Sequence, residues 1–298
     1  MTGVDAQLRV GLVGAGPWAR IVHAPGLFEH PATKLTTVWA RRTEAATELA
    51  EARGASVSGS FDELLDQVDA VAFAVPPAVQ AGLAITAAEA GKHLILEKPI
   101  AGDLATAERL AAAIGDAGVA ALVMLTLRYA PETQEWLDGV AETGGWVGGA
   151  GRWLSGALLG EAYGGSAWRH ESGALVDVGP HAFDLLDAAL GEITDVLSAH
   201  RADNDLWHLT FQHAGGVTST ATLSMKLPII PTVFEVAVYG QNGYRVLGKR
   251  PGTSNECYTA LLDDFAAMID SGVREHTCDV RRGLHLQRII DKAQRLTA

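Results

Sequence analysis

The sequence predicts an α/β protein with an N-terminal doubly wound parallel sheet and a C-terminal α+β domain whose open sheet is mainly antiparallel. Three observations lead to this prediction. Short apolar runs alternate with Ala-rich amphipathic stretches up to about residue 126, a glycine-rich turn follows the first run, and the later half contains longer Thr- and Val-bearing runs separated by turn residues. We therefore divide the chain into residues 1–126 and 127–298, with the last helix a candidate to pack back on the first domain.

In the first domain the apolar runs have the length of buried strands, and the stretches between them have the length of helices. Gly54, Gly91 and Gly118 stand near the helix ends, where glycine can take the left-handed conformation that terminates a helix. Ser60 and Glu63 form a capping box that marks a further helix start. The expected strands are 8–13, 34–40, 70–75, 93–97 and 119–126, and the expected helices are 43–53, 78–90 and 104–116. Right-handed helical crossovers between such strands give a parallel sheet.

In the second domain one strong helix is expected at about 177–190, and two closing helices at 258–269 and 280–296. The runs 206–213, 217–227 and 232–239 have the composition of strands. Gly215-Gly216 and Gln241-Asn242-Gly243 separate such runs and are typical of hairpin turns, which join antiparallel neighbours.

Composition excludes several classes of function. A chain of 298 residues with a net charge of −12 repels nucleic acid and anionic membranes unless a basic stripe is present, and the sequence shows none. Two cysteines, Cys257 and Cys278, are too few for a disulfide scaffold, and no leader-like segment opens the sequence, so we expect a cytoplasmic protein. The histidines lack metal-ligand spacing, and we expect no metal.

The glycine-rich turn, residues 14–19, is the strongest local signal. Gly14, Gly16 and Ala19 match the small positions of a dinucleotide-binding turn, with Pro17 and Trp18 between them. The turn follows a strand and precedes a helix, whose free N–H groups and positive dipole end favour phosphate. A purely structural glycine turn is the alternative.

The residues at the end of the second strand indicate which dinucleotide is preferred. A carboxylate expected there would bind the ribose 2′-hydroxyl of NAD, but the sequence has Ala40, Arg41 and Arg42. Ala40 leaves room for a 2′-phosphate, and two guanidinium groups can pair with it. We therefore expect NADP, with NAD the less favoured cofactor. Alternatively, the arginines are solvated residues that open the next helix.

Three residues are candidates for catalysis. Lys98 follows the strand that ends at Glu97, at the sheet edge where doubly wound folds bind ligands, and could serve in proton transfer. Asp177 and His181 stand four residues apart, a spacing that places a carboxylate beside an imidazole on one helical face. Spacing alone leaves a second interpretation open, in which Asp177 is only the N-cap of a helix whose first turn contains Pro180, and His181 is a half-buried structural histidine.

The chain resembles the glucose-fructose oxidoreductase, inositol dehydrogenase and MocA family, Gfo/Idh/MocA. The resemblance rests on three separated motifs, residues 14–19, 97–101 and 172–186, in this order and spacing. It implies an N-terminal Rossmann domain and a second domain whose open sheet often makes a dimer contact. It also implies that His181 exchanges the proton of a secondary alcohol or ketone, while Lys98 and Asp177 hydrogen-bond to it and polarise it. The cofactor contacts expected are Gly14, Gly16, Pro17, Trp18, Ala19, Ala40, Arg41, Arg42, Val75, Pro76, Glu97 and Lys98.

Two positions depart from this family's pattern. Gln80 stands where a histidine is common, and Thr126 stands where an asparagine is common. These departures bear on the substrate more than on the class of reaction. Candidates to line the substrate pocket are Arg128, Tyr163, Trp168 and Arg169, with core packing as the alternative for the aromatic residues.

Together these features predict an NADP-dependent dehydrogenase or ketoreductase acting on a sugar, a cyclitol or a related polyol. Another carbonyl substrate on the same scaffold is an alternative. A dinucleotide-binding sensor without catalysis is a second one, which the full set Lys98, Asp177 and His181 disfavours. We expect a homodimer or homotetramer, because an open sheet face in the second domain needs a cover.

Overall fold

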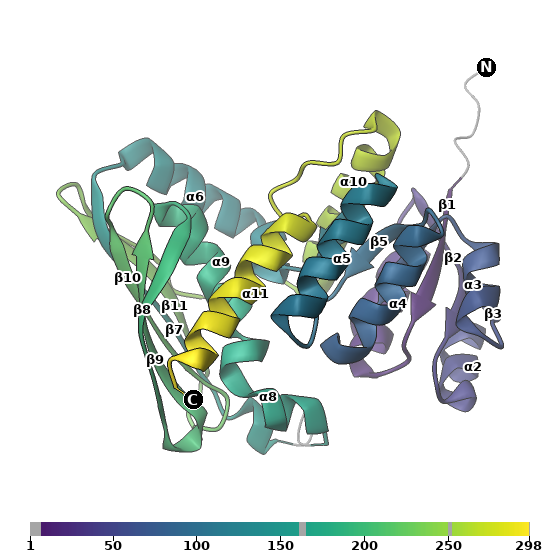
Figure 1. Cartoon of the computed structure of the whole chain (residues 1–298), viewed down its shortest axis with the longest axis horizontal. Coiled ribbons are helices and arrows are strands. Elements are labelled where there is room, and N and C mark those ends of the chain that lie inside the picture. The colour runs from purple at the N-terminus through teal and green to yellow at the C-terminus, as the bar shows by residue number, and fades with distance from the viewer. Residues whose placement is uncertain (1–6, 161–164, 250–251, 298) are drawn as a thin grey trace. The chain divides into compact units, whose positions relative to one another are not determined.

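The computed structural model describes residues 7–160, 165–249 and 252–297. The chain forms two compact units. The first contains Met1–Thr126 and Thr253–Leu284, and the second contains Leu127–Gly252 and His285–Ala298. The chain therefore enters the first unit twice (Figure 1).

The first unit holds a six-stranded parallel sheet with the order β3-β2-β1-β4-β5-β6. Its strands are β1 (Leu8–Val13), β2 (Thr33–Trp39), β3 (Ser56–Val57), β4 (Ala70–Phe73), β5 (His93–Leu96) and β6 (Ala121–Val123). The strand order reverses between β1 and β4, and ligands of doubly wound sheets bind at the carboxyl ends of the strands at such a point. The predicted parallel sheet is confirmed. The short strand β3 has no apolar run and was not predicted.

The helices of this unit begin and end at residues whose chemistry explains their positions. The Ser60 hydroxyl accepts the Glu63 N–H at 3.1 Å, and Asp103 accepts the Thr106 N–H at 2.8 Å. Gly118, with φ 63°, terminates the second of these helices. The helices are α1 (Ala24–Glu29), preceded by a π-helical turn (Ala19–His23), α2 (Thr43–Glu51), α3 (Phe61–Gln67), α4 (Pro77–Glu89), α5 (Leu104–Ala117) and α10 (Ser254–Ser271).

Helix α10 belongs to the first unit although it follows the second unit in the sequence. A capping box of Thr253 and Glu256 starts it. It packs against α1, where a Cβ on Gly26 would lie 2.9 Å from Cε1 of Tyr258. The glycine therefore lets the fully buried Tyr258 ring approach the α1 backbone.

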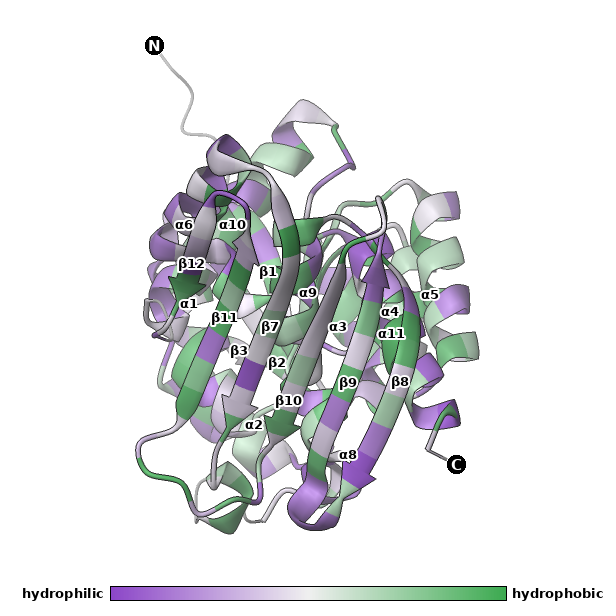
Figure 2. Cartoon of the chain, turned by 90° about the vertical axis from the view of Figure 1, so that its left-hand side faces the viewer, coloured by the Kyte–Doolittle hydropathy of each residue, from purple (hydrophilic) through white to green (hydrophobic). Residues whose placement is uncertain are grey.

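The second unit holds a six-stranded sheet with the order β12-β11-β7-β10-β9-β8 (Figure 2). Strands β7 and β10 pair in parallel, which was not predicted, and all other neighbours are antiparallel, in agreement with the mainly antiparallel sheet that the sequence predicts. The expected hairpins are confirmed, since Gly215-Gly216 joins β9 to β10 and Gln241-Asn242 joins β11 to β12. The strands are β7 (Trp146–Leu154), β8 (Ile193–Ala202), β9 (Leu206–His213), β10 (Thr218–Ser224), β11 (Val233–Gly240) and β12 (Gly243–Leu247).

Strand β7 was not predicted because glycine is depleted in strands. Its glycines allow α9 (Gly179–Leu190) to pack closely on one face of the sheet. A Cβ on Gly149 would lie 2.7 Å from Cδ1 of Leu190, and a Cβ on Gly151 would contact Leu186 at 3.4 Å. Side chains of α9 thus fill the space that side chains of β7 would otherwise occupy.

Among the residues that the structure describes, the second unit also contains α6 (Pro131–Thr143), α8 (Ala167–Asp177) and most of α11 (Val280–Arg295). The part of α11 counted with this unit contacts it through polar pairs. His285 Nε2 lies 3.2 Å from Asp187, and Lys292 Nζ lies 3.3 Å from Asp195. Among the described residues, none of the helices combines the length and the apolar character needed to cross a bilayer.

Candidate active site

The glycine-rich turn lies directly after β1. Gly14 has φ 114°, and a Cβ there would lie 2.9 Å from the Ala74 carbonyl carbon, so only glycine fits. At Gly16, by contrast, a Cβ would meet nothing within 4 Å. The space above Gly16 is therefore open, as close approach of a pyrophosphate to the backbone requires. The turn fits a dinucleotide.

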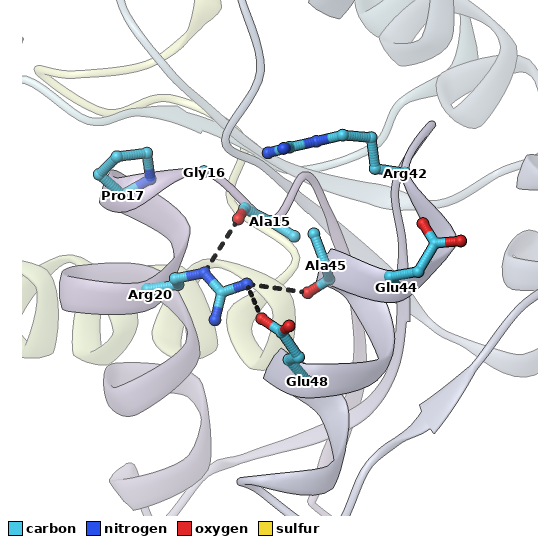
Figure 3. A pocket seen from close by; sticks show the side chains of 8 residues that line it. All are labelled: Ala15, Gly16, Pro17, Arg20, Arg42, Glu44, Ala45 and Glu48. Atoms are coloured by element: carbon cyan, nitrogen blue, oxygen red, sulfur yellow. Dashed lines mark hydrogen bonds and ion pairs between the residues drawn. The ribbon is translucent and has the colours of Figure 1, made fainter. Parts of the chain in front are cut away.

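A cavity of about 380 Å³ lies beside this turn (Figure 3). Arg42 extends toward the turn from the far side of the cavity, at the N-cap position of α2, and is exposed. Arg41 is also exposed, and Ala40 is half-buried at the end of the second strand. The residues that line the cavity are Ala15, Gly16, Pro17, Arg20, Arg42, Glu44, Ala45 and Glu48.

Arg20, which the sequence did not single out, holds the two walls of this cavity together. Its Nε donates to the Ala15 carbonyl at 3.2 Å, and its Nη2 donates to the Ala45 carbonyl at 3.2 Å and to Glu48 Oε2 at 2.9 Å (Figure 3). The guanidinium group therefore connects the glycine-rich turn to helix α2, and Arg42 stands at the start of that helix.

Glu97 connects the glycine-rich turn to the segment that bears Lys98. Its Oε1 accepts the indole N–H of Trp18 at 2.7 Å and lies 2.8 Å from His23 Nε2. His23 Nδ1 lies 3.1 Å from the hydroxyl of Tyr258. Burial, and secondly the charge of Glu97, raise the pKa of Tyr258 well above its ordinary value, so this phenol stays protonated.

Lys98 follows β5 at the carboxyl edge of the first sheet and is half-buried. Val75 and Pro76 follow the neighbouring strand β4 and are also half-buried. Because β1, β4 and β5 are parallel neighbours, these residues and the turn at Gly14 lie at one edge of the sheet. The first unit thus brings its predicted residues together.

Asp177 is the last residue of α8, and its side chain is held by a cation. Arg169 Nε donates to Asp177 Oδ2 at 3.0 Å, and both side chains are largely buried. The Arg169 guanidinium lies over the Trp168 ring, 4.5 Å from its centroid. The N-cap interpretation of Asp177 is wrong, because the residue before α9 is Val178 and makes no side-chain cap.

His181 lies in the first turn of α9 and is only 7% exposed. Its ring stacks on Trp153 of β7, with centroids 5.8 Å apart and planes inclined by 28°. The stack fixes the plane of the imidazole. A buried, oriented imidazole is suited to proton transfer.

The remaining predicted residues do not lie together. Arg128 Nη1 donates to the buried Asp184 at 3.3 Å. Thr126, the last residue of the first unit, is buried. Tyr163 lies outside the described residues.

Asp205 supports the Asp177 helix and was missed in the sequence. Its side chain is 1% exposed, and it accepts the Ala174 N–H and, at 3.0 Å, the Trp207 indole N–H. Ala174 follows Gly173, where the helix is interrupted by φ 69° and ψ −167°. A carboxylate far along the chain therefore caps the helical turn that ends at Asp177, and no local spacing could reveal it.

Comparison with known proteins is consistent with this geometry. Residues 8–125 match the profile of GFO_IDH_MocA, described as an oxidoreductase family with an NAD-binding Rossmann fold. The 4-carboxy-2-hydroxymuconate-6-semialdehyde dehydrogenase of Sphingobium sp. is 34% identical over 130 residues, which are 43% of this chain and 41% of that protein. The dTDP-3,4-didehydro-2,6-dideoxy-alpha-D-glucose 3-reductase of Actinomadura kijaniata is 27% identical over 233 residues, which are 74% of this chain and 69% of the relative. The chain thus spans less than half the length of the first of these curated relatives.

Solved structures share the fold over nearly the whole chain. GenD2 from gentamicin A biosynthesis, in complex with NAD, superposes with a TM-score of 0.85 at 22% identity over 99% of this chain and 95% of that one. KijD10, a 3-ketoreductase from Actinomadura kijaniata in complex with NADP, gives a TM-score of 0.79 at 21% identity over 98% of each chain. Residues 8–125 are therefore similar in sequence to the GFO_IDH_MocA oxidoreductases with an NAD-binding Rossmann fold, and the two solved structures extend the likeness in fold to nearly the whole chain.

Proposed function

We propose that this protein transfers hydride between C4 of NADP(H) and a secondary alcohol or ketone of a sugar, a cyclitol or a related polyol. Lys98, Asp177 and His181 carry the chemistry. The proposal depends on one observation, the burial and fixed orientation of Asp177 and His181. Both are polar and almost fully buried, and each has a partner that fixes its orientation, Arg169 for the carboxylate and Trp153 for the imidazole. Buried titratable groups held in this way are typical of functional sites.

The bound dinucleotide supplies or accepts the hydride, and the chain supplies the proton. In the direction of reduction, His181 gives its proton to the substrate oxygen as the carbonyl carbon becomes tetrahedral. Lys98 is the candidate in the first unit to hydrogen-bond to a substrate oxygen and to stabilise negative charge that develops there. Asp177 orients the reacting groups, and its ion pair with Arg169 keeps the carboxylate in place.

The preference for NADP rests on the cavity beside Gly16. Arg42 lines it, and no acid stands at Ala40 to bind a free 2′-hydroxyl. Glu44 and Glu48 also line the cavity, but Glu48 is paired with Arg20. We expect the double variant Arg41→Ser/Arg42→Ser to lose affinity for NADPH about tenfold or more while its affinity for NADH changes little. Calorimetric titration of both cofactors measures this, and wild type that binds NADH as tightly as NADPH would refute the preference.

The substrate class rests on the relatives. One of them is named as a reductase of a deoxy sugar nucleotide. A panel of ketoses, inososes and sugar acids, mixed with NADPH and followed by the loss of reduced-cofactor absorbance, tests the activity. Lys98→Met and His181→Ala should each lower kcat about 100-fold or more, and His181→Ala should leave cofactor binding intact. Cofactor binding without turnover of any substrate would favour a sensor instead.

We also propose that the protein is a homodimer or homotetramer. Tyr239 of β11 pairs with Tyr244 of β12, and Val246 stands two residues further along β12. Tyr239 is aligned with Gly148 of β7, whose neighbour Gly149 faces α9, so these side chains belong to the sheet face opposite α9, the face toward the viewer in Figure 2. These three side chains are 42–59% exposed. Light scattering should give the mass of two or four chains, and a uniform monomer would contradict the proposal.

A further inference from the structure

Gln80 is a buried polar residue at the carboxyl edge of the first sheet. It lies in the first turn of α4, which begins shortly after β4, and it has no exposed surface. Strand β5 pairs with β4, and the segment that carries Lys98 follows β5 directly. The sequence therefore places an amide side chain beside the backbone on which Lys98 stands.

The amide oxygen and the amide nitrogen of Gln80 both hydrogen-bond to that backbone. Gln80 Oε1 accepts the Glu97 N–H at 2.8 Å. Its Nε2 donates to the Glu97 carbonyl at 2.8 Å and to the Ile100 carbonyl at 3.2 Å. The three bonds bracket Lys98, one residue before it and two residues after it, in a segment that has left the regular strand. Pro99, between these anchors, has no N–H of its own to contribute.

Glutamine suits this position for a chemical reason. The backbone offers one donor and two acceptors, and a neutral amide offers one acceptor oxygen and two N–H donors. An imidazole has only two ring nitrogens, so histidine meets at most two of the three groups. A carboxylate would accept the Glu97 N–H but would oppose two carbonyl oxygens, and leucine would satisfy none of the three.

A second set of contacts holds Glu97 independently of Gln80. The Glu97 carboxylate is bonded to Trp18 and His23. Loss of the Gln80 amide therefore frees the backbone around Lys98 but leaves the Glu97 side chain bonded to Trp18 and His23. The protein should still fold when Gln80 is replaced by an apolar residue of similar size.

We propose that Gln80 is a positioning residue for Lys98. It acts by fixing the backbone at Glu97 and Ile100, and the inference rests on the proposed role of Lys98 in catalysis. Because a displacement of about 1 Å in a reacting group can lower turnover 100-fold, the position of this backbone matters more for kcat than for binding.

The kinetic test compares Gln80→Leu, Gln80→His and wild type. Gln80→Leu should lower kcat about 10- to 100-fold, with KM and the NADPH dissociation constant changed less than about threefold. Gln80→His, which keeps two bonds, should recover a large part of kcat. The matched control is Gln67→Leu in α3 of the same unit, whose amide donates to the Glu63 carbonyl at 2.9 Å and to Ser58 at 3.2 Å. This control should lose stability and keep kcat.

A second readout does not depend on turnover. The lysines are labelled by reductive methylation with ¹³C, and the Lys98 resonance is assigned with Lys98→Arg. Gln80→Leu should shift or broaden the Lys98 resonance, and Gln67→Leu should not. Gln80→Leu with unchanged kcat and an unchanged Lys98 resonance, despite a lower melting temperature, would overturn the proposal. Wild type that reduces no panel member would instead refute the proposed function, and the Lys98 resonance would still decide the role of Gln80.

Discussion

Replacing Gly173 by alanine tests how the helix that ends at Asp177 is held. Gly173 has φ 69° and ψ −167°, a region of backbone conformation that is essentially restricted to glycine. A Cβ on this residue would lie 2.7 Å from Cγ of Asp205. Alanine must therefore adopt a strained backbone and displace the Asp205 carboxylate at the same time.

The cost can be worked out from these two effects. The backbone strain contributes about 1–3 kcal/mol. Displacing Asp205 weakens its bonds from the Ala174 N–H and the Trp207 indole, which leaves buried polar groups poorly satisfied at about 1–3 kcal/mol. We expect Gly173→Ala to lower the free energy of unfolding by about 2–6 kcal/mol, a large share of the 5–15 kcal/mol of a typical protein.

Urea unfolding followed by circular dichroism and by tryptophan fluorescence measures this change. The matched control is Gly82→Ala in α4, where a Cβ would meet nothing within 4 Å, and it should gain about 0.5–1 kcal/mol. In a double-mutant cycle with Asp205→Ala, the part due to the clash should vanish, so the two costs should not add. A loss below about 1 kcal/mol for Gly173→Ala, or strict additivity in the cycle, would refute this account of the helix start.

Three further predictions concern the first unit. Burial, and then the charge of Arg274, lower the pKa of His93, whose Nδ1 accepts the Ala120 N–H at 3.0 Å. Just below about pH 6.5, His93 is therefore more protonated in the unfolded chain than in the folded one, and the folded state loses stability as the pH falls. His93→Gln should make urea unfolding less dependent on pH in this range. Asp103→Ala should cost about 1 kcal/mol by removing the N-cap of α5, and an unchanged urea midpoint would contradict this. Arg20→Met should weaken NADPH and NADH binding to a similar degree, about several-fold, because Arg20 braces the cavity wall. A selective loss of NADPH affinity in calorimetry would instead indicate that Arg20 binds the 2′-phosphate directly.

Local pattern predicted most elements of the first unit. The run 8–13 is β1, and the alternation of apolar runs with Ala-rich stretches gave the parallel sheet. The signals there are short-range, because a buried strand is continuously apolar and a helix is capped by its own neighbours, as at Ser60 and Asp103. In the second unit β7 and β8 were missed. The glycines of β7 carry no local strand signal, because their role is to allow α9 to pack closely.

The candidate site divides in the same way. The sequence identified as candidates the glycine-rich turn, Lys98, Asp177 and His181, because each lies in a motif with its own spacing. Their supports were not visible. Arg20 is paired with Glu48, Gln80 with the backbone of Glu97, and Ala174 with Asp205, and each pair joins residues on different elements.

The sequence by itself therefore predicted most strands and helices of residues 8–126 and the residues with chemical character. It did so because periodicity, capping and turn chemistry act between residues a few positions apart. Only the tertiary structure decided that residues 253–284 belong to the first unit. It also decided that Asp177 ends a helix and pairs with Arg169, and that Gln80 hydrogen-bonds to the backbone around Lys98. Those contacts join residues distant in the sequence, where hydrogen-bond geometry and close packing, rather than local propensity, select the partner.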